Sequence, residues 1–342
     1  MKLRAPEALE DRPPSAMVCP TKVSMRILHL DSGREMRGGQ WQVLRLMEGL
    51  RRESVGCTLL SPRGSPLWDR ARALQLDVRP LSLWAIYRLS RQSDLIHAHD
   101  ARTHTLAAVL AAALTTASNA PPLVVSRRVA FPIRSRWKYR QARHYAAVSQ
   151  FVKGVMLDGG VREQEISVIY DGVPLGEPAA GGETQLQTGL ATRLEARLAT
   201  VVAPASGDPR KGTALALEAT RRAGVDLLFS RDLESDLAGA ALFLYLTHAE
   251  GLGSAILMAL AAGVPVIASN VGGIPEIVRH RENGWLTENE PEAVAAAIRD
   301  LLADRPFALG LAARGRQTVA EKFSLDQMIH NTVQLYRQVL AC

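Results

Sequence analysis

Short apolar runs alternate with helical patterns along most of the chain, and this alternation constrains the fold more than any other feature of the sequence. Strands that alternate with helices form a parallel, doubly wound sheet covered by helices on both faces. We therefore expect an α/β fold with Rossmann-like sheets. The expected strands are 26–30, 56–61, 95–99, 123–126, 145–149, 166–170, 199–203, 225–229, 241–245 and 265–268, and the expected helices are 41–52, 66–74, 105–116, 213–223, 254–262, 292–303, 307–323 and 325–340.

The length of 342 residues predicts two domains, because a domain typically holds about 150 residues. Residues 1–24 carry four prolines and no apolar periodicity, so we expect a disordered extension, and Met25 is a candidate start. The Gly-rich stretch 176–189 indicates a linker between the halves. The longest apolar stretch, 255–268, is too short to span a bilayer, for which about 20 residues are needed.

Charge differs between the halves of the chain. Residues 1–170 hold 26 Lys and Arg against 14 Asp and Glu, whereas residues 171–342 hold 15 against 20. No acid lies between Asp100 and Asp158, and this segment includes Arg102, Arg127 and Arg128 among its nine cations. Such a segment fits an anionic partner, namely an acceptor, a phospholipid face or nucleic acid, and a solvated basic face is the plainer interpretation. Three widely spaced cysteines predict neither a disulfide framework nor a thiolate zinc site, which favours a reducing, cytoplasmic compartment.

The first candidate site is Arg37-Gly38-Gly39-Gln40, between the first strand and a helix. Gly38 and Gly39 let backbone amides approach a ligand, and a helix N-terminus favours negative charge. The pattern lacks the G-x-G-x-x-G dinucleotide fingerprint, and a plain tight turn explains it equally well.

The second candidate is His97-Ala98-His99-Asp100, at a strand end where a doubly wound sheet forms its ligand crevice. Alternation places His97 and His99 on one face, with His99 nearer the crevice and Asp100 turned away. We expect His99 to contact substrate or handle a proton. A structural histidine remains an alternative, and a metal site would need a further ligand.

The third candidate, residues 249–278, is the most specific. The carboxylate of Glu250 precedes a Gly-containing turn and an apolar helix that begins near Gly253, Ser254 and Ala255. The amides and dipole of a helix N-terminus would suit a pyrophosphate. The block therefore predicts a negative side chain beside an anion pocket.

These motifs, in this order, resemble the retaining enzymes of glycosyltransferase family 4, which have the GT-B fold of two facing Rossmann-like domains. The matching landmarks are Arg37–Gln40, His97–His99, Val168-Ile169-Tyr170-Asp171-Gly172-Val173 and the block from Glu250 to Glu276, and the resemblance covers about residues 25–340. It implies an acceptor-binding N-domain at 25–172, a donor-binding C-domain at 173–324 and a final helix at 325–342 that crosses back to the N-domain.

The resemblance further implies transfer of a sugar from a UDP- or GDP-linked donor to a glycan or lipid-linked acceptor of the cell surface, with retained configuration. It implies neither a metal nor a separate cofactor, and a place in the cytoplasm or at the inner face of the membrane. We expect no nucleic-acid partner, because aromatic content is low and no nucleic-acid-binding module matches. Glu250 and His99 match catalytic positions. The positions that match donor or phosphate contacts are Gly38, Gly39, Arg210, Lys211, Gly253, Ser254, Ala255, Gly272, Gly273 and Glu276.

The chain departs from the family pattern at three places. Met258 stands where a second glutamate should hold the donor ribose, and Ser206 stands where an arginine often accompanies the lysine. Only 224–239 separates the helix ending near 223 from the strand at 241, so about one βα unit of roughly 30 residues is missing and the C-domain is shortened. A degenerate GT-B protein that binds a glycan, lipid or partner without catalysis is therefore the alternative.

Overall fold

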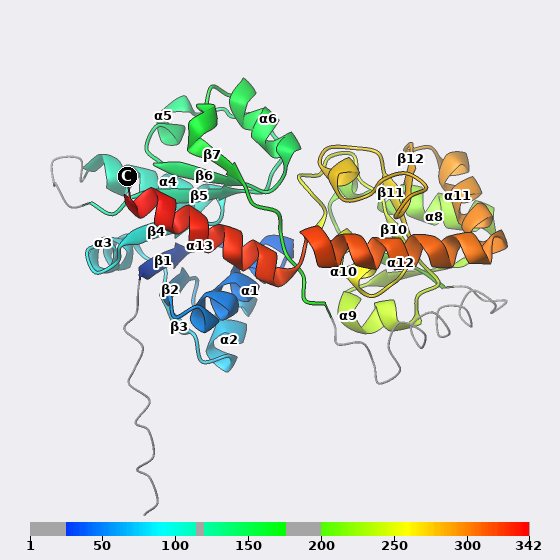
Figure 1. Cartoon of the computed structure of the whole chain (residues 1–342), viewed down its shortest axis with the longest axis horizontal. Coiled ribbons are helices and arrows are strands. Elements are labelled where there is room, and N and C mark those ends of the chain that lie inside the picture. Colours follow the sequence, from blue (N-terminus) through cyan, green and yellow to red (C-terminus); the bar gives the residue numbers. More distant parts are fainter. Residues whose placement is uncertain (1–24, 114–119, 176–199, 342) are drawn as a thin grey trace, which may run out of the picture.

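The computed structural model describes residues 25–113, 120–175 and 200–341, which form two α/β domains side by side along the long axis of the molecule (Figure 1). The expected extension at 1–24 and the expected linker at 176–189 lie outside the described residues. Two parallel sheets flanked by helices confirm the predicted fold class.

The N-domain contains a seven-stranded parallel sheet in the order β3-β2-β1-β4-β5-β6-β7. Its strands are β1 (Arg26–Leu30), β2 (Gly56–Ser61), β3 (Asp77–Pro80), β4 (Leu95–Ala98), β5 (Leu123–Arg127), β6 (His144–Ala147) and β7 (Ile166–Val168). Its helices are α1 (Gly38–Arg52), α2 (Pro66–Ala73), α3 (Leu83–Ser90), α4 (Ala101–Ala113), α5 (Arg136–Tyr139), α6 (Gln150–Asp158) and the 3-10 turn η1 (Glu163–Glu165). The strand order reverses between β1 and β4, so the loops after these strands border a crevice.

The C-domain contains a five-stranded parallel sheet in the order β12-β11-β10-β8-β9. Its strands are β8 (Thr200–Pro204), β9 (Asp226–Ser230), β10 (Leu242–Tyr245), β11 (Val266–Ser269) and β12 (Trp285–Thr287). Its helical elements are η2 (Pro209–Lys211), α8 (Thr213–Ala223), α9 (Leu233–Asp236), η3 (Leu237–Gly239), α10 (Ser254–Ala261), η4 (Ile274–Glu276), α11 (Pro291–Ala303) and α12 (Arg305–Lys322). Between β9 and β10 the chain makes only the short turns α9 and η3, which agrees with the predicted shortening. Among the described helices, none is both long and apolar enough to cross a membrane.

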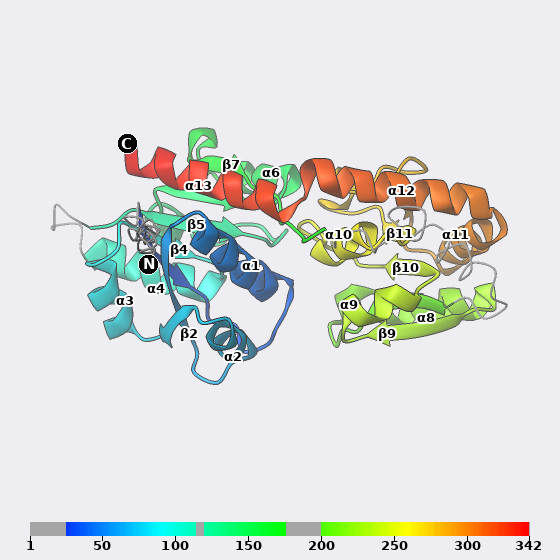
Figure 2. The same cartoon turned by 60° about the horizontal axis from the view of Figure 1, so that its bottom comes forward.

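The last helix, α13 (Leu325–Ala341), leaves the C-domain and packs on α1 of the N-domain, as Figure 2 shows. The two chain segments that pass between the domains pair with each other: the Val173 amide donates to the Phe323 carbonyl, and the Leu325 amide donates to the Val173 carbonyl, both at 3.0 Å. On the N-domain side, apolar residues of α13 such as Ile329 and Val333 join the core formed by β1 and α1.

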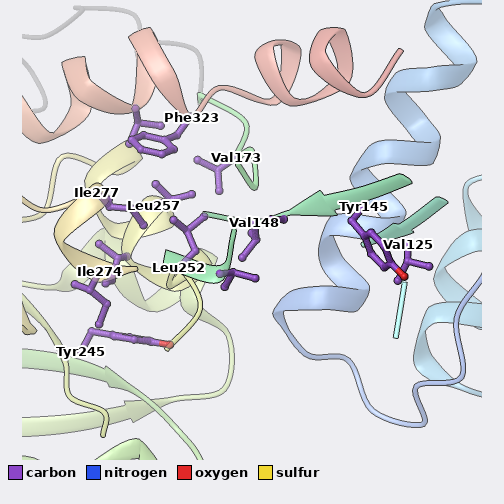
Figure 3. Close-up of a cluster of buried hydrophobic side chains, with 14 of the residues drawn as sticks. Val125, Tyr145, Val148, Val173, Tyr245, Leu252, Leu257, Ile274, Ile277 and Phe323 are labelled. Carbon is purple, nitrogen blue, oxygen red and sulfur yellow. The ribbon is translucent and has the colours of Figure 1, made fainter. Parts of the chain in front are cut away.

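Buried apolar side chains form a continuous cluster that crosses the domain boundary (Figure 3). Val148 comes from the N-domain, Leu252 and Ile274 come from the C-domain, and Phe323 comes from the end of α12. All four are at most 2% exposed. Burial of apolar surface stabilises this contact between the domains by about 25 cal/mol for each Å². The domains are therefore held together by packing as well as by the connecting chain.

Candidate functional site

Lys211 and Glu250 meet at the C-terminal edge of the C-domain sheet. Lys211 follows β8 and Glu250 follows β10, and these neighbouring strands flank the point where the strand order reverses. Lys211 Nζ donates to Glu250 Oε2 at 2.6 Å, and the Tyr245 hydroxyl donates to the same oxygen at 2.5 Å. The other oxygen, Oε1, accepts the Gly251 amide at 3.0 Å. The predicted lysine and glutamate therefore form one partly buried, charge-assisted cluster.

Backbone conformations that favour glycine shape the loops around this cluster. Gly253, the residue before α10, has φ +102°, and Gly272 has φ +58°. A Cβ on Gly272 would lie 2.0 Å from the Glu250 carbonyl oxygen, and a Cβ on Gly273 would lie 2.0 Å from the Gly251 carbonyl oxygen. Both loops thus pack backbone against backbone, which leaves no room for a side chain.

Two helix N-termini from different domains converge beside the cluster. Gly38 and Gly39 form the first turn of α1, and Ser254 and Ala255 form the first turn of α10. A Cβ on Gly38 would lie 2.7 Å from Ser254 Oγ. The free amides of both helices are therefore close together, which favours an anionic group between the domains.

One turn further along α10 and two turns along α1, Met258 faces Arg45. Arg45 Nη2 lies 3.8 Å from Met258 Sδ. Burial lowers the pKa of the Arg45 guanidinium, and in the described part of the chain no carboxylate forms a salt bridge with it. An N-domain cation therefore lies beside the position where the family pattern has a carboxylate on the C-domain.

Glu276, predicted as a donor contact, is engaged across the domain boundary. Its carboxylate accepts the backbone amides of Gln150 and Phe151 at 2.8 and 2.7 Å, at the start of α6, and it accepts the Tyr170 hydroxyl at 2.9 Å. Nearby, the Ser149 hydroxyl donates to the Gly251 carbonyl at 2.6 Å. In this conformation Glu276 caps an N-domain helix, so its predicted contact with the donor remains a prediction.

Arg210 precedes Lys211 but points to a different partner. Its guanidinium forms an ion pair with Asp208 at 2.7 Å and lies over the Phe131 ring, 5.0 Å from the centroid. Hydrogen bonds from Arg210 lower the pKa of Asp208 to about 2. Arg210 thus contacts the N-domain across the domain boundary, because Phe131 belongs to the N-domain.

Three buried histidines lie together under the N-domain crevice. His29 on β1 is in register with His97 on β4, and a hydrogen bond of 2.9 Å joins His29 Nδ1 to His99 Nε2. His97 bonds to the Tyr336 hydroxyl of α13 at 2.6 Å and to Ser126 Oγ at 2.8 Å. Burial lowers the pKa of His29 to about 3 and those of His97 and His99 well below 6.5, so all three imidazoles are neutral near pH 7.

This arrangement corrects the prediction that His99 faces an open crevice. His99 is only 6% exposed, because the rings of His29 and His97 pack against it. Candidate ligand atoms of the three histidines lie within 4.8 Å of one another, so they are the group that could hold a metal. Both nitrogens of His97 already have partners, however, and no carboxylate or thiolate belongs to this group in the described residues. The geometry therefore fits a hydrogen-bonded histidine cluster better than a metal centre.

Asp100 turns away from the histidines, as strand alternation predicts. Its carboxylate accepts the amides of Arg102 and Thr103 at the start of α4 and the amide and hydroxyl of Ser32 in the loop after β1. Asp100 therefore caps a helix and fixes the loop on the opposite side of the crevice.

Of the three arginines predicted to form an acceptor surface, Arg102, Arg127 and Arg128, only the first is exposed. Arg127 donates to the Tyr139 hydroxyl and to the Phe131 carbonyl, and so holds the loop after β5. Arg128 donates from Nε to Asp171 Oδ1 at 3.2 Å, in a pair whose side chains are 18% and 8% exposed. The expectation of an exposed cation is thus wrong for Arg128, because its charge is paired inside the protein.

Sequence reasoning missed Tyr245, Arg45 and His29 as members of the site. Tyr245 ends a buried strand and is indistinguishable from a core aromatic in the sequence, while Arg45 lies on a helix without a motif. His29 offered a signal: it occupies the first strand, which pairs with the strand of His97 in a doubly wound sheet.

Comparison with known proteins places these features in a family. The family described as "Glycosyl transferases group 1" matches residues 200–318, and "Glycosyltransferase Family 4" matches residues 36–177. Among solved structures, Anabaena HepE in complex with UDP and glucose superimposes with a TM-score of 0.76 and 18% identity, over 91% of this chain and 99% of that one. Sucrose-phosphate synthase from Thermosynechococcus elongatus superimposes with a TM-score of 0.70 and 20% identity, over 93% and 99%.

Curated relatives match over shorter segments. N-acetyl-alpha-D-glucosaminyl L-malate synthase of Bacillus anthracis is 35% identical over 105 residues, 30% of this chain and 28% of the relative. The GDP-mannose-dependent alpha-(1-6)-phosphatidylinositol monomannoside mannosyltransferase of Mycobacterium tuberculosis is 44% identical over 80 residues, 23% of this chain and 21% of the relative. The matched segments thus span less than a third of either relative.

The two facing Rossmann-like domains, with the site between them, define a protein of the GT-B class. The two family matches together cover more than half of the chain, and the chain belongs to glycosyltransferase family 4.

Proposed function

We propose that this protein transfers a sugar, with retained anomeric configuration, from a UDP- or GDP-linked donor to a glycan or lipid-linked acceptor in cell-surface polysaccharide or lipopolysaccharide synthesis in the cytoplasm. The observation that carries the proposal is the Lys211–Glu250 pair, which lies at the strand-order reversal of the C-domain, with Glu250 a few residues before the start of α10, where Ser254 meets Gly38 of α1. Family membership and the relatives named above support the reaction class.

Lys211 and the amides at the start of α10 act on the donor diphosphate. As the sugar leaves the phosphate, negative charge grows on the departing oxygens, and a cation with preorganised amides stabilises that charge. The protein can supply this neutralisation from its own residues, so we propose a reaction that does not require a metal.

Glu250 orients the donor sugar and balances positive charge on it. Retaining transfer passes through an oxocarbenium-like centre, which a nearby carboxylate stabilises. Tyr245 and Lys211 hold one oxygen of Glu250, and the Gly251 amide holds the other. The carboxylate is therefore fixed in place before the donor arrives.

Arg45 is the residue positioned to hold the donor from the N-domain. Met258 cannot accept a hydrogen bond from a ribose hydroxyl as a glutamate would, and Ser206 brings no cation. The Arg45 guanidinium reaches Met258 across the boundary and can donate to ribose or phosphate oxygens. Donor binding would then depend on both domains.

A binding protein without catalysis is the second candidate. Met258, the five-stranded C-domain sheet and the burial of His99 favour it, because each removes a group that a transferase of this family is expected to use.

Calorimetric titration with UDP- and GDP-sugars tests donor binding. We expect heat with at least one donor for the unmodified chain and a 10- to 100-fold loss of affinity for Lys211→Ala, since a hydrogen bond to a charged group contributes about 1.5–3 kcal/mol. Lys322→Ala, an exposed change in the same domain, is the control and should bind normally. If Lys211→Ala bound the donor with unchanged affinity, the assignment of the site would be wrong. If no donor gave heat, the proposed transferase function would be wrong.

A further inference from the structure

Helix α3 carries apolar side chains on its outer face as well as on its inner face. Ile86 and Leu89 point into the core and are 0% and 7% exposed. On the opposite side, Leu83, Trp84 and Tyr87 are 59%, 65% and 38% exposed. Single exposed apolar residues are common on proteins. Three on one eight-residue helix, however, form an apolar patch whose exposure to water is unfavourable.

Two arginines lie against the aromatic rings of this patch. The Arg88 guanidinium lies over the Trp84 ring at 5.1 Å from the centroid, and Arg91 lies over the Tyr87 ring at 5.8 Å. Arg91 also donates from Nη1 to the Tyr87 hydroxyl at 3.1 Å. The outer face of α3 therefore combines apolar surface, amphipathic rings and positive charge within a few residues.

The neighbouring helices α4 and α5 also carry exposed apolar side chains. Lys138 of α5 donates to the Ala101 carbonyl at 3.1 Å and to Thr105 Oγ1 at 3.3 Å, and so ties α5 to α4, while α4 in turn contacts α3. Val109 of α4 and Trp137 of α5 are each 49% exposed. We name the outer surface formed by α3, α4 and α5 the three-helix face.

Acidic residues are almost absent from this part of the chain. Between Asp77 and Asp158 the sequence holds two acids, Asp94 and Asp100, against twelve Lys and Arg. Asp94 accepts the Arg26 amide at 2.7 Å, and Asp100 caps α4. Both acids accept hydrogen bonds from backbone amides, and because cations outnumber acids this stretch of the chain has a net positive charge even though Arg128 is paired with Asp171.

We propose that the three-helix face binds the surface of an anionic phospholipid bilayer. Trp and Tyr favour the boundary between headgroups and acyl chains, Leu83 adds apolar area, and the arginines meet the negative headgroups. A second copy of the chain fits the face less well, because pairing it with itself would oppose like charges. The lipid, not a protein partner, complements both its charge and its apolar side chains.

One end of the face is continuous with a loop that contacts the C-domain. The loop between β5 and α5 carries Phe131, which is 45% exposed and lies under the Arg210 guanidinium of the C-domain. A membrane-bound N-domain would hold this loop near the headgroups. This link to the site rests on the proposed function, whereas membrane binding itself requires no catalysis and can fail or succeed independently.

Co-sedimentation with vesicles tests the proposal on the full chain. The probes are vesicles of phosphatidylcholine alone and of phosphatidylcholine with phosphatidylglycerol, at low and high salt. We expect binding to the anionic vesicles, with at least a tenfold loss for the double variant Leu83→Glu and Trp84→Glu. The matched control is Leu217→Glu, which changes a leucine that is 52% exposed on α8 of the C-domain and should bind as the unmodified chain does.

The charge is tested separately with Arg88→Gln and Arg91→Gln, each of which should weaken binding about fivefold at low salt. Equal binding to neutral and anionic vesicles, or equal loss in the Leu217→Glu control, would overturn the proposal. Light scattering after gel filtration tests whether the face instead binds a second copy of the chain. If the chain formed a dimer that the Leu83 and Trp84 changes dissociate, the face would be a dimer interface and the membrane proposal would be wrong.

Discussion

The carboxylate of Glu250 accepts hydrogen bonds from Lys211 and Tyr245 at the edge of the C-domain sheet, and we expect its removal to affect sugar transfer more than folding. Glu250→Gln keeps the shape of the side chain but removes its charge. We expect a loss of transfer of about 10²–10³-fold, the usual effect of deleting one preorganised electrostatic contact. The measurement is nucleotide release with the active donor, and circular dichroism should show an unchanged fold.

Glu282→Gln, an exposed change in the same domain, serves as the control for Glu250→Gln. If both variants retained full turnover, Glu250 would not belong to the reacting centre.

The Arg45 guanidinium is half-buried beside a methionine, and among the described residues no carboxylate is close enough to form a salt bridge with it, so removing its charge from water costs stability. Met258→Glu should supply that carboxylate and raise the free energy of unfolding by about 1 kcal/mol. Arg45→Met should raise it too, since apolar packing replaces the isolated charge. Urea unfolding measures both, and a decrease for Met258→Glu would show that the two side chains do not approach in solution.

The roles of individual residues could be predicted where they lie in a sequence motif, but not where they depend on a contact that no motif indicates. Lys211 and Glu250, about 40 positions apart, follow neighbouring strands, and the sheet brings them together as the strand pattern implies. The inward turn of Arg128 depends on Asp171, and the sequence contains no sign that these two residues would pair.

At the scale of elements, the start of α6 depends on a residue from the other domain. Glu276 accepts the amides of Gln150 and Phe151, and Tyr170 donates to it. Glu276→Ala leaves those amides without a cap, so the free energy of unfolding should fall by about 1–2 kcal/mol. Small-angle scattering should also show a larger separation of the domains.

The control for Glu276→Ala is Glu292→Ala, which removes two exposed ion pairs, with Arg299 and Arg222, and should change stability by less than about 0.5 kcal/mol. An effect of Glu276→Ala no larger than that of the control would mean that the interdomain cap does not persist in solution.

Most strands and long helices could be predicted from periodicity, and the differences have local causes. Helix α1 begins at Gly38, three residues before the expected start, because the Gln40 side chain accepts the Arg37 amide and compensates for two poor helix formers. The strands β3 and β12, of four and three residues, are edge strands and too short for a periodic signal. Helix α6 has no counterpart among the expected helices, and the expected strand 145–149 includes Ser149, which in the structure caps this helix.

At the scale of the whole molecule, the buried histidines should make the protein sensitive to acid. In the unfolded chain a histidine binds a proton below pH 6.5, whereas burial lowers the pKa of His29 to about 3 and those of His97 and His99 well below their ordinary value. The unfolded state therefore takes up more protons as the pH falls through 6.5. Each histidine can cost up to about 1.4 kcal/mol of stability per pH unit below that point.

Urea unfolding at pH 7.5, 6.5 and 5.0 measures this dependence. We expect little change above pH 6.5 and a fall of at least about 2 kcal/mol between 6.5 and 5.0. Burial raises the pKa of Asp31 and Asp171, which acts in the opposite direction at lower pH. His29→Gln should reduce the slope, and a slope that is identical in this variant would exclude His29 as a cause.

The central claim, glycosyl transfer at the Lys211–Glu250 site, is tested most directly by following a labelled sugar. Unmodified protein and Glu250→Gln are each incubated with labelled UDP- and GDP-sugars and a bacterial membrane extract, and the label in the acceptor fraction is measured. The account predicts labelled product with one donor, an anomeric configuration by NMR that equals that of the donor, and about 10²–10³-fold less product with Glu250→Gln. Donor binding without label in any acceptor, or equal product from both proteins, would contradict it.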